Sequence, residues 1–125
     1  MSMAALENVG GLMKRLGIPY AFMRKNTKAG VDYYFVGEYD EIPMPTREEN
    51  GRQDTNFILR GFTRKDWLLL EEAKAKIEKH ASFTAILPDG TGIAVSYDGA
   101  TVVPTGDAEL KSIKINLTIR EWRVN

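Results

Sequence analysis

Apolar and polar side chains alternate strictly near the C-terminal end of the sequence. The apolar positions are Ile113, Ile115, Leu117 and Ile119, and between them stand Ser112, Lys114, Asn116, Thr118 and Arg120. Successive side chains of a strand point to opposite faces, so this alternation places every aliphatic residue on one face. It predicts a final strand over residues 109–123, with its aliphatic face in the core. Trp122 departs from the alternation: either a bulge near Glu121 returns it to the inner face, or it points outward.

Two segments show the apolar spacing of amphipathic helices. In residues 3–16 the apolar positions recur at helical intervals, with Ser2 as the expected N-cap and Gly17 as the expected stop. Thr63 is the expected N-cap of a second helix over residues 64–79. The apolar face of that helix comprises Trp67, Leu70, Ala73, Ile77 and Ala81.

The remaining apolar segments are rich in aromatic and β-branched residues, which favour strands. They are residues 20–23, 31–39, 54–64, 83–87 and 93–97. The turn residues between the last two segments predict a hairpin. Residues 99–107 contain Pro104 and Gly106 and are expected to be a connection. The order helix, strands, helix, strands predicts a single α+β domain over residues 1–125, in which two helices pack on one face of a mostly antiparallel sheet.

A long charged segment separates two of the expected strands. Residues 40–53 contain two prolines and a glycine among many charges, which predicts a long loop or an extended hairpin reaching away from the body. Residues 38–54 carry six acidic and two basic side chains, whereas residues 1–30 carry five basic side chains and one acidic one. Such blocks could pair between copies of the chain, or they could be ordinary solvated surface. The candidate interface residues are Asp40, Glu41, Arg47, Glu48, Glu49 and Arg52.

The overall composition is that of a folded, neutral domain. Hydrophobic residues make up 43% of the chain and charged residues 27%, which argues against global disorder. Equal numbers of basic and acidic residues give a formal charge of zero, which argues against a dedicated nucleic-acid binder. The absence of cysteine excludes disulfides and thiolate metal sites. No apolar run approaches the roughly 20 residues that span a bilayer, so we expect no membrane partner.

The sequence contains no recognisable set of catalytic residues. The single histidine, His80, follows a helix and has no recognisable nucleophile or acid beside it. Asp89 and Asp98 each precede a glycine, as in ordinary tight turns, and match no calcium loop. Tyr33 and Phe35 share one strand face and could stack bases, but packing in a core or an interface is the simpler interpretation. We therefore predict a non-enzymatic protein without catalytic residues, cofactors or metal ligands.

The C-terminal half carries a likeness to a known class of proteins. The residues concerned are Gly92-Ile93-Ala94-Val95 with Tyr97, the run from Val103 to Lys111, the strand Ile113–Ile119, and Glu121-Trp122. Upstream, Gly37-Glu38-Tyr39 and the run from Phe57 to Gly61 fit the same layout. In these features the chain resembles the small neck and tail-completion proteins of tailed phages and prophages, in particular the tail terminators.

The resemblance implies a compact α+β subunit that oligomerises, usually as a hexameric ring, at the end of the tail tube. Such a ring stops tube polymerisation and presents a surface to the head connector. The implied partners are further copies of the chain, the tail tube protein and head-connector proteins. The resemblance implies no enzymatic activity, no cofactor and no sequence-specific nucleic acid. The expected location is the host cytoplasm during assembly and then the tail or neck of the virion.

Three alternatives remain at this point. The first is another neck component, such as a head-closure protein. The second is an enzyme or a small-ligand-binding α+β domain whose site forms only in three dimensions. The third is a nucleic-acid-associated protein that uses the basic N-terminal region.

Overall fold

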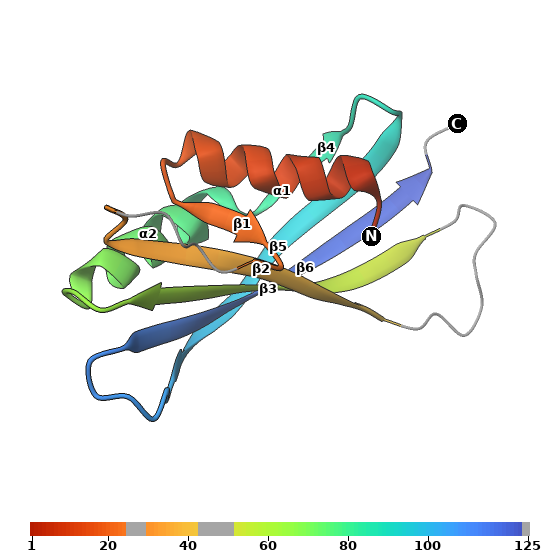
Figure 1. Cartoon of the computed structure of the whole chain (residues 1–125). Helices are drawn as coiled ribbons and strands as arrows, with labels where there is room; N and C mark the ends of the chain where they lie inside the picture. Colours follow the sequence, from red (N-terminus) through yellow and green to blue (C-terminus); the bar gives the residue numbers. More distant parts are fainter. Residues whose placement is uncertain (25–29, 43–51, 124–125) are drawn as a thin grey trace.

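The computed structural model describes residues 1–24, 30–42 and 52–123 of the chain (Figure 1). The elements follow the expected order of helix, strands, helix and strands. They are α1 (Met3–Arg15), β1 (Tyr20–Phe22), β2 (Tyr33–Ile42), β3 (Gln53–Thr63), α2 (Leu68–His80), β4 (Phe83–Ile86), β5 (Thr91–Val103) and β6 (Lys111–Arg123).

The strands form one sheet in the order β1-β2-β3-β6-β5-β4. β1 runs parallel to β2, and every other neighbouring pair is antiparallel. The long strands β3, β6 and β5 form the middle of the sheet, and the short strands β1 and β4 lie at its two edges. The mostly antiparallel α+β domain expected from the sequence is therefore confirmed.

Both helices pack on the same face of the sheet, which we call the inner face (Figure 1). The alternating residues of the final strand fall on it as predicted: Ile113, Ile115, Leu117 and Ile119 are each at most 1% exposed. They join Phe57 and Leu59 of β3 and the buried sides of both helices in one apolar cluster. Burial of this apolar surface is the main stabilising contribution to the fold.

The two helix starts differ in how they are capped. Ser2 caps α1 as predicted, because its hydroxyl oxygen accepts a hydrogen bond of 3.1 Å from the backbone N–H of Ala5. The second helix is present as predicted, but its expected start and N-cap were wrong: α2 begins at Leu68, and Thr63 is the last residue of β3. The Thr63 hydroxyl donates to the carbonyl of Asp32 instead, at 2.8 Å, and so fastens the end of the strand.

The connection predicted over residues 99–107 is also wrong in part, because β5 continues to Val103. A bulge between Tyr97 and Gly99 shifts the register of β5 against β6. Gly99 adopts a φ of 134°, a conformation that residues with a side chain rarely take. Because the bulge interrupts the alternation of apolar and polar side chains, the sequence predicts a loop in place of the second half of the strand. The hairpin of β4 and β5 is confirmed.

Candidate assembly surface

The face of the sheet opposite the helices, here called the open face, carries a mixture of apolar and polar side chains. Strand alternation places its members opposite the buried residues of each strand. Its larger apolar side chains are Tyr34, Val36, Ile58, Phe62, Ile86 and Trp122. The rings of Tyr34 and Phe62 pack with their centroids 5.4 Å apart across β2 and β3. Partly exposed aromatic side chains such as these are enriched where proteins contact one another.

Several polar side chains of the open face are paired within the chain. Glu38 forms an ion pair with Arg60 of the neighbouring strand, and the Thr118 hydroxyl donates to Asp98. By contrast, no ion pair within the described residues involves Asp40 or Lys114. These two charges, of opposite sign, are therefore available to a partner.

Trp122 points outward and lies on the open face. Its strand partner in β5 is Gly92, and a Cβ atom on Gly92 would clash with the indole ring. β6 keeps its alternation through Glu121, which pairs with Ile93 and faces the helices. Of the two placements left open by the sequence, the outward one is therefore correct, and the bulge near Glu121 is wrong.

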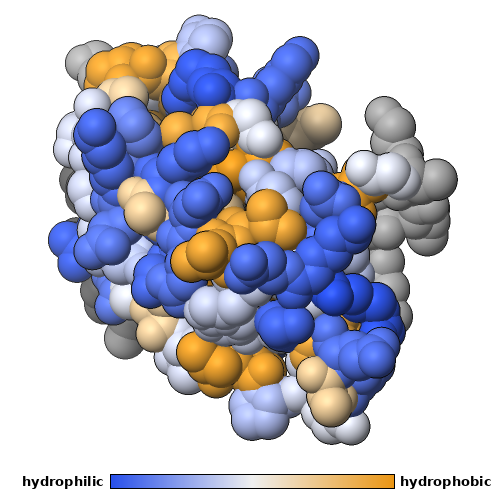
Figure 2. All heavy atoms as spheres, turned by 90° about the vertical axis from the view of Figure 1, so that its left-hand side faces the viewer, coloured by the Kyte–Doolittle hydropathy of each residue, from blue (hydrophilic) through white to orange (hydrophobic). Residues whose placement is uncertain are grey.

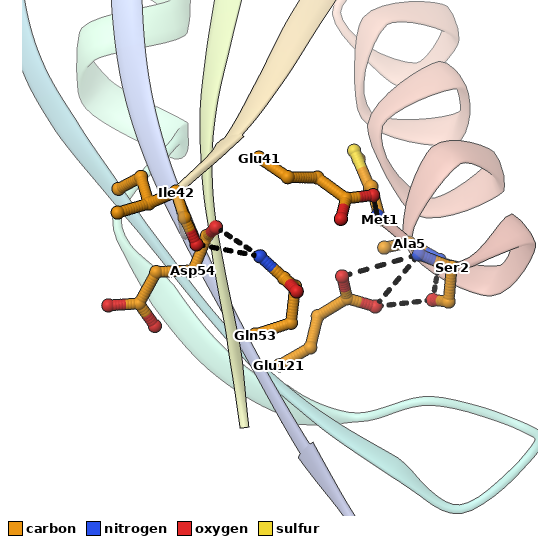
Figure 3. Close-up of polar contacts among 8 residues, drawn as sticks. All are labelled: Met1, Ser2, Ala5, Glu41, Ile42, Gln53, Asp54 and Glu121. Carbon is orange, nitrogen blue, oxygen red and sulfur yellow. Dashed lines mark hydrogen bonds and ion pairs between the residues drawn. The ribbon is translucent and has the colours of Figure 1, made fainter. Parts of the chain in front are cut away.

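Glu121 fastens the first turn of α1 to the last strand (Figure 3). The side chain is only 5% exposed, and its two carboxylate oxygens lie 3.2 and 3.3 Å from the backbone nitrogen of Ser2. The Ser2 hydroxyl also donates to this carboxylate. Sequence reasoning missed this contact, although one signal was present: Glu121 occupies the next inner-face position after Ile119.

The predicted interface residues that the structure describes are placed differently from one another. Asp40 is exposed on the open face near the end of β2. Glu41 faces the helix side, where its carboxylate lies 2.5 Å from the Met1 nitrogen (Figure 3). Arg52 donates two hydrogen bonds of 3.1 Å to Asp54. Two of the three are thus held within the chain, and only Asp40 is presented outward.

The other predicted interface residues, Arg47, Glu48 and Glu49, lie outside the described residues. The strands on either side of them extend further toward this segment than expected, because β2 ends at Ile42, β3 begins at Gln53, and the two pair as far as Ile42 and Asp54. Gln53 closes this end by donating hydrogen bonds to the carbonyls of Ile42 and Asp54 (Figure 3). The ends of the charged segment therefore belong to paired strands, and whether the rest is a loop or an extended hairpin lies outside the described residues.

The surface also contains shallow hollows. One of them, of about 540 Å³, lies between Trp67 at the start of α2 and the turn that joins β5 to β6. Figure 2 views this end of the molecule, where apolar side chains form small separate groups among hydrophilic ones. Asp107 in this hollow has a lowered pKa, because it accepts hydrogen bonds from the Glu109 backbone N–H and from Arg64. These contacts give Asp107 a structural part in the turn.

The described residues offer no further candidate for a catalytic or metal-binding site. They contain no group of three or more acidic, histidine or cysteine side chains placed to hold a metal ion. His80 is exposed at the end of α2. Asp89 accepts a hydrogen bond of 2.9 Å from the Thr91 backbone N–H, as expected of a turn residue. That the protein is not an enzyme stays a prediction.

No protein-family model matches the chain, and no curated protein matches it. Within the described part of the chain, neither helix has the length and apolar character needed to cross a membrane.

Proposed function

We propose that this chain is a structural subunit of the tail or neck of a tailed phage or prophage. In this proposal it is a tail terminator, which caps the tail tube and joins it to the head connector. The likeness of the C-terminal half to such proteins supports the proposal. The observation that carries it is the open face of the sheet, with aromatic and aliphatic side chains on a face that neither helix covers.

The placement of charge supports self-association of a head-to-tail kind. The start of α1 lies beside Glu41 at one end of β2. Lys14 and Arg15 are exposed in the last turn of the helix, about 18 Å further along its axis at 1.5 Å per residue. The carboxylates near the end of β2, Asp40 exposed and Glu41 paired with the Met1 nitrogen, thus lie at the end of the layer away from Lys14 and Arg15. Contacts between unlike ends are heterologous, and they close into rings when the rotation between subunits allows it.

A closed ring suits the capping role because it leaves no unpaired end to which further subunits can be added. One side of the ring would contact the tail tube protein, and the other side the head-connector proteins. Assembly would take place in the host cytoplasm, and the ring would then remain in the tail or neck of the virion.

Deletion of the gene from the phage or prophage that encodes it tests this function. After induction, electron microscopy should show tails of irregular length and heads without tails, and a plasmid copy of the gene should restore normal particles. Peptides of the chain should be detected by mass spectrometry in the restored particles. Normal tails together with heads that lose their DNA would instead identify a head-closure protein. Infectious particles of normal form without the gene would refute a role in the tail or neck.

A further inference from the structure

We propose that copies of this chain join by strand pairing, with the free part of β2 in one copy against the free part of β5 in the next. This inference rests on the ring assembly proposed above and names the surfaces that form it. We call residues 38–42 the β2 edge and residues 98–103 the β5 edge. Both lie at the borders of the sheet, beyond the reach of the short strands β1 and β4.

The β2 edge has backbone groups directed away from the sheet. β1 pairs with β2 only as far as Gly37, whose carbonyl accepts a hydrogen bond of 2.8 Å from the Met23 N–H. The Phe35 N–H likewise donates toward this border, to the carbonyl of Pro19. Backbone groups alternate along a strand, so Tyr39 and Glu41 direct the next N–H and C=O groups to the same border. Within the described residues no strand pairs with them there.

The β5 edge is its counterpart at the opposite border. β4 pairs with β5 from Gly92 to Val95, and the Tyr97 N–H reaches the Ser82 hydroxyl at 3.4 Å. Beyond that point no described strand covers β5. Val102 in this segment is 63% exposed. Uncovered strand borders are templates for the addition of another strand, and neither edge contains a proline that would prevent it.

The two edges are complementary in direction and in position. Each neighbouring pair in the order β2-β3-β6-β5 is antiparallel, so β5 runs antiparallel to β2. When two copies have the same orientation, the β5 edge of one copy therefore meets the β2 edge of the next in an antiparallel arrangement. The two edges lie toward opposite ends of the sheet. The β5 edge pairs with the part of β6 around Lys114, whereas the β2 edge pairs with the part of β3 that begins near Asp54, toward the other end. A second copy displaced along the strands by about four residues, roughly 14 Å, places Asp40 opposite Thr101 and brings the edges together without a clash between β1 and β4. Such a stagger accompanies closure of strands into a ring.

Charge also fits a second copy as the partner. Asp40 lies on the open face of the β2 edge, and Lys114 lies on the same face of β6, beside Thr101 of the β5 edge. In the paired copies Asp40 and Lys114 are separated by the small side chain of Thr101, across which a lysine can reach. Each of these two charges has no ion pair among the described residues of its own copy.

Introduced cysteines give a sharp test, because the chain contains none. Asp40→Cys is combined in turn with Ala100→Cys, Thr101→Cys, Val102→Cys and Val103→Cys, and each protein is oxidised and run on a non-reducing gel. Strand pairing predicts a ladder of cross-linked copies for positions 101 and 103, which share the open face with Asp40, and little cross-linking for 100 and 102. Single-cysteine proteins have no second thiol across this contact and should stay uncross-linked. Equal cross-linking at all four positions, or none, would overturn the proposal.

A proline pair identifies the border that is used. Val102→Pro blocks the β5 edge at a position whose N–H faces outward. Ile86→Pro is the matched control: Ile86 is 60% exposed on β4, and its N–H faces outward because Leu87 donates to Thr91. In analytical ultracentrifugation, Val102→Pro should raise the concentration needed for assembly at least tenfold, and Ile86→Pro should leave it unchanged. Assembly that resists Val102→Pro, or that only Ile86→Pro abolishes, would overturn pairing at the β5 edge.

These results separate this inference from the function on which it rests. The cysteine variants are also supplied to the gene-deleted phage, and the restored particles are oxidised, so that assembly on a partner is tested as well. Restored particles without the alternating ladder would refute strand pairing while the tail function stands. Failure of the proposed tail function would instead appear as normal, infectious particles after gene deletion.

Discussion

Glu121 near the end of β6 accepts hydrogen bonds from both the backbone N–H and the hydroxyl of Ser2, the residue that caps α1. One buried carboxylate thus holds the helix start against the last strand. Ser2→Ala removes the cap and one of these bonds, so it should lower the free energy of unfolding by about 1–2 kcal/mol in urea titrations. Ser96→Ala, at an exposed serine of β5, is the matched control and should cost less than about 0.5 kcal/mol.

The coupling between Ser2 and Glu121 can be measured in a double-mutant cycle. Glu121→Gln keeps the shape of the side chain but weakens its hydrogen bonds with Ser2. The double variant should be less destabilised than the sum of the two single variants, because both remove the same contact. Additive effects would show that the two residues stabilise the fold independently.

The core strand β6 should not tolerate a charge on its inner face. Leu117 is 1% exposed, and Leu117→Asp places an unpaired carboxylate in an apolar layer. We expect a loss of about 4 kcal/mol or complete unfolding, observed by circular dichroism during heating. Asn116→Asp puts the same group on the open face one residue away and should melt close to the parent protein. A Leu117→Asp protein with an unchanged melting temperature would place this strand outside the core.

Gly92 leaves room for the indole of Trp122 on the open face. Gly92→Ala should displace the ring and destabilise the protein by about 1–3 kcal/mol, although alanine is otherwise the better residue in a strand. In a Trp67→Phe background Trp122 is the sole tryptophan, so its emission spectrum should shift with the substitution. The cost of Gly92→Ala should fall when Trp122→Ala is also present. A cost that persists in that background would mean that the ring is not the cause.

Tyr20 should make the stability of the protein sensitive to alkaline pH. Burial raises the pKa of its hydroxyl from 10.0 to about 12. Between these values the unfolded chain loses the Tyr20 proton while the folded chain keeps it, so the stabilising contribution present below pH 10 is lost as pH rises. Denaturant titrations across this range should show a steeper loss of stability for the parent than for Tyr20→Phe. Equal slopes would show that Tyr20 ionises alike in both states.

The local parts of the fold follow from the sequence because they depend on neighbouring residues alone. Period-two alternation identified β6, and helical spacing identified both helices. The start of α2 could not be read in this way, because Thr63 is the last residue of β3 and pairs in the sheet with Tyr33 and Lys111, which lie far away in the sequence. The second half of β5 was hidden by the bulge at Gly99.

The candidate surface was harder to predict than the elements that form it. Alternating strands can pair in many orders, so the sequence does not reveal that β2 and β5 extend beyond β1 and β4. The charged segment did identify Asp40, which the structure presents outward. It also suggested Glu41 and Arg52, whose charges meet the Met1 nitrogen and Asp54 within the chain. Charge alone does not distinguish internal pairs from contacts between copies.

The mass of the protein in solution, followed by light scattering over a wide range of concentration, decides whether the chain builds a ring. Closure predicts that the mass rises to a plateau at a fixed whole multiple of 14.0 kDa and stays there as concentration increases. Material extracted from purified particles should have the same mass. A mass of 14.0 kDa in both preparations, or one that grows without limit, would refute a closed ring.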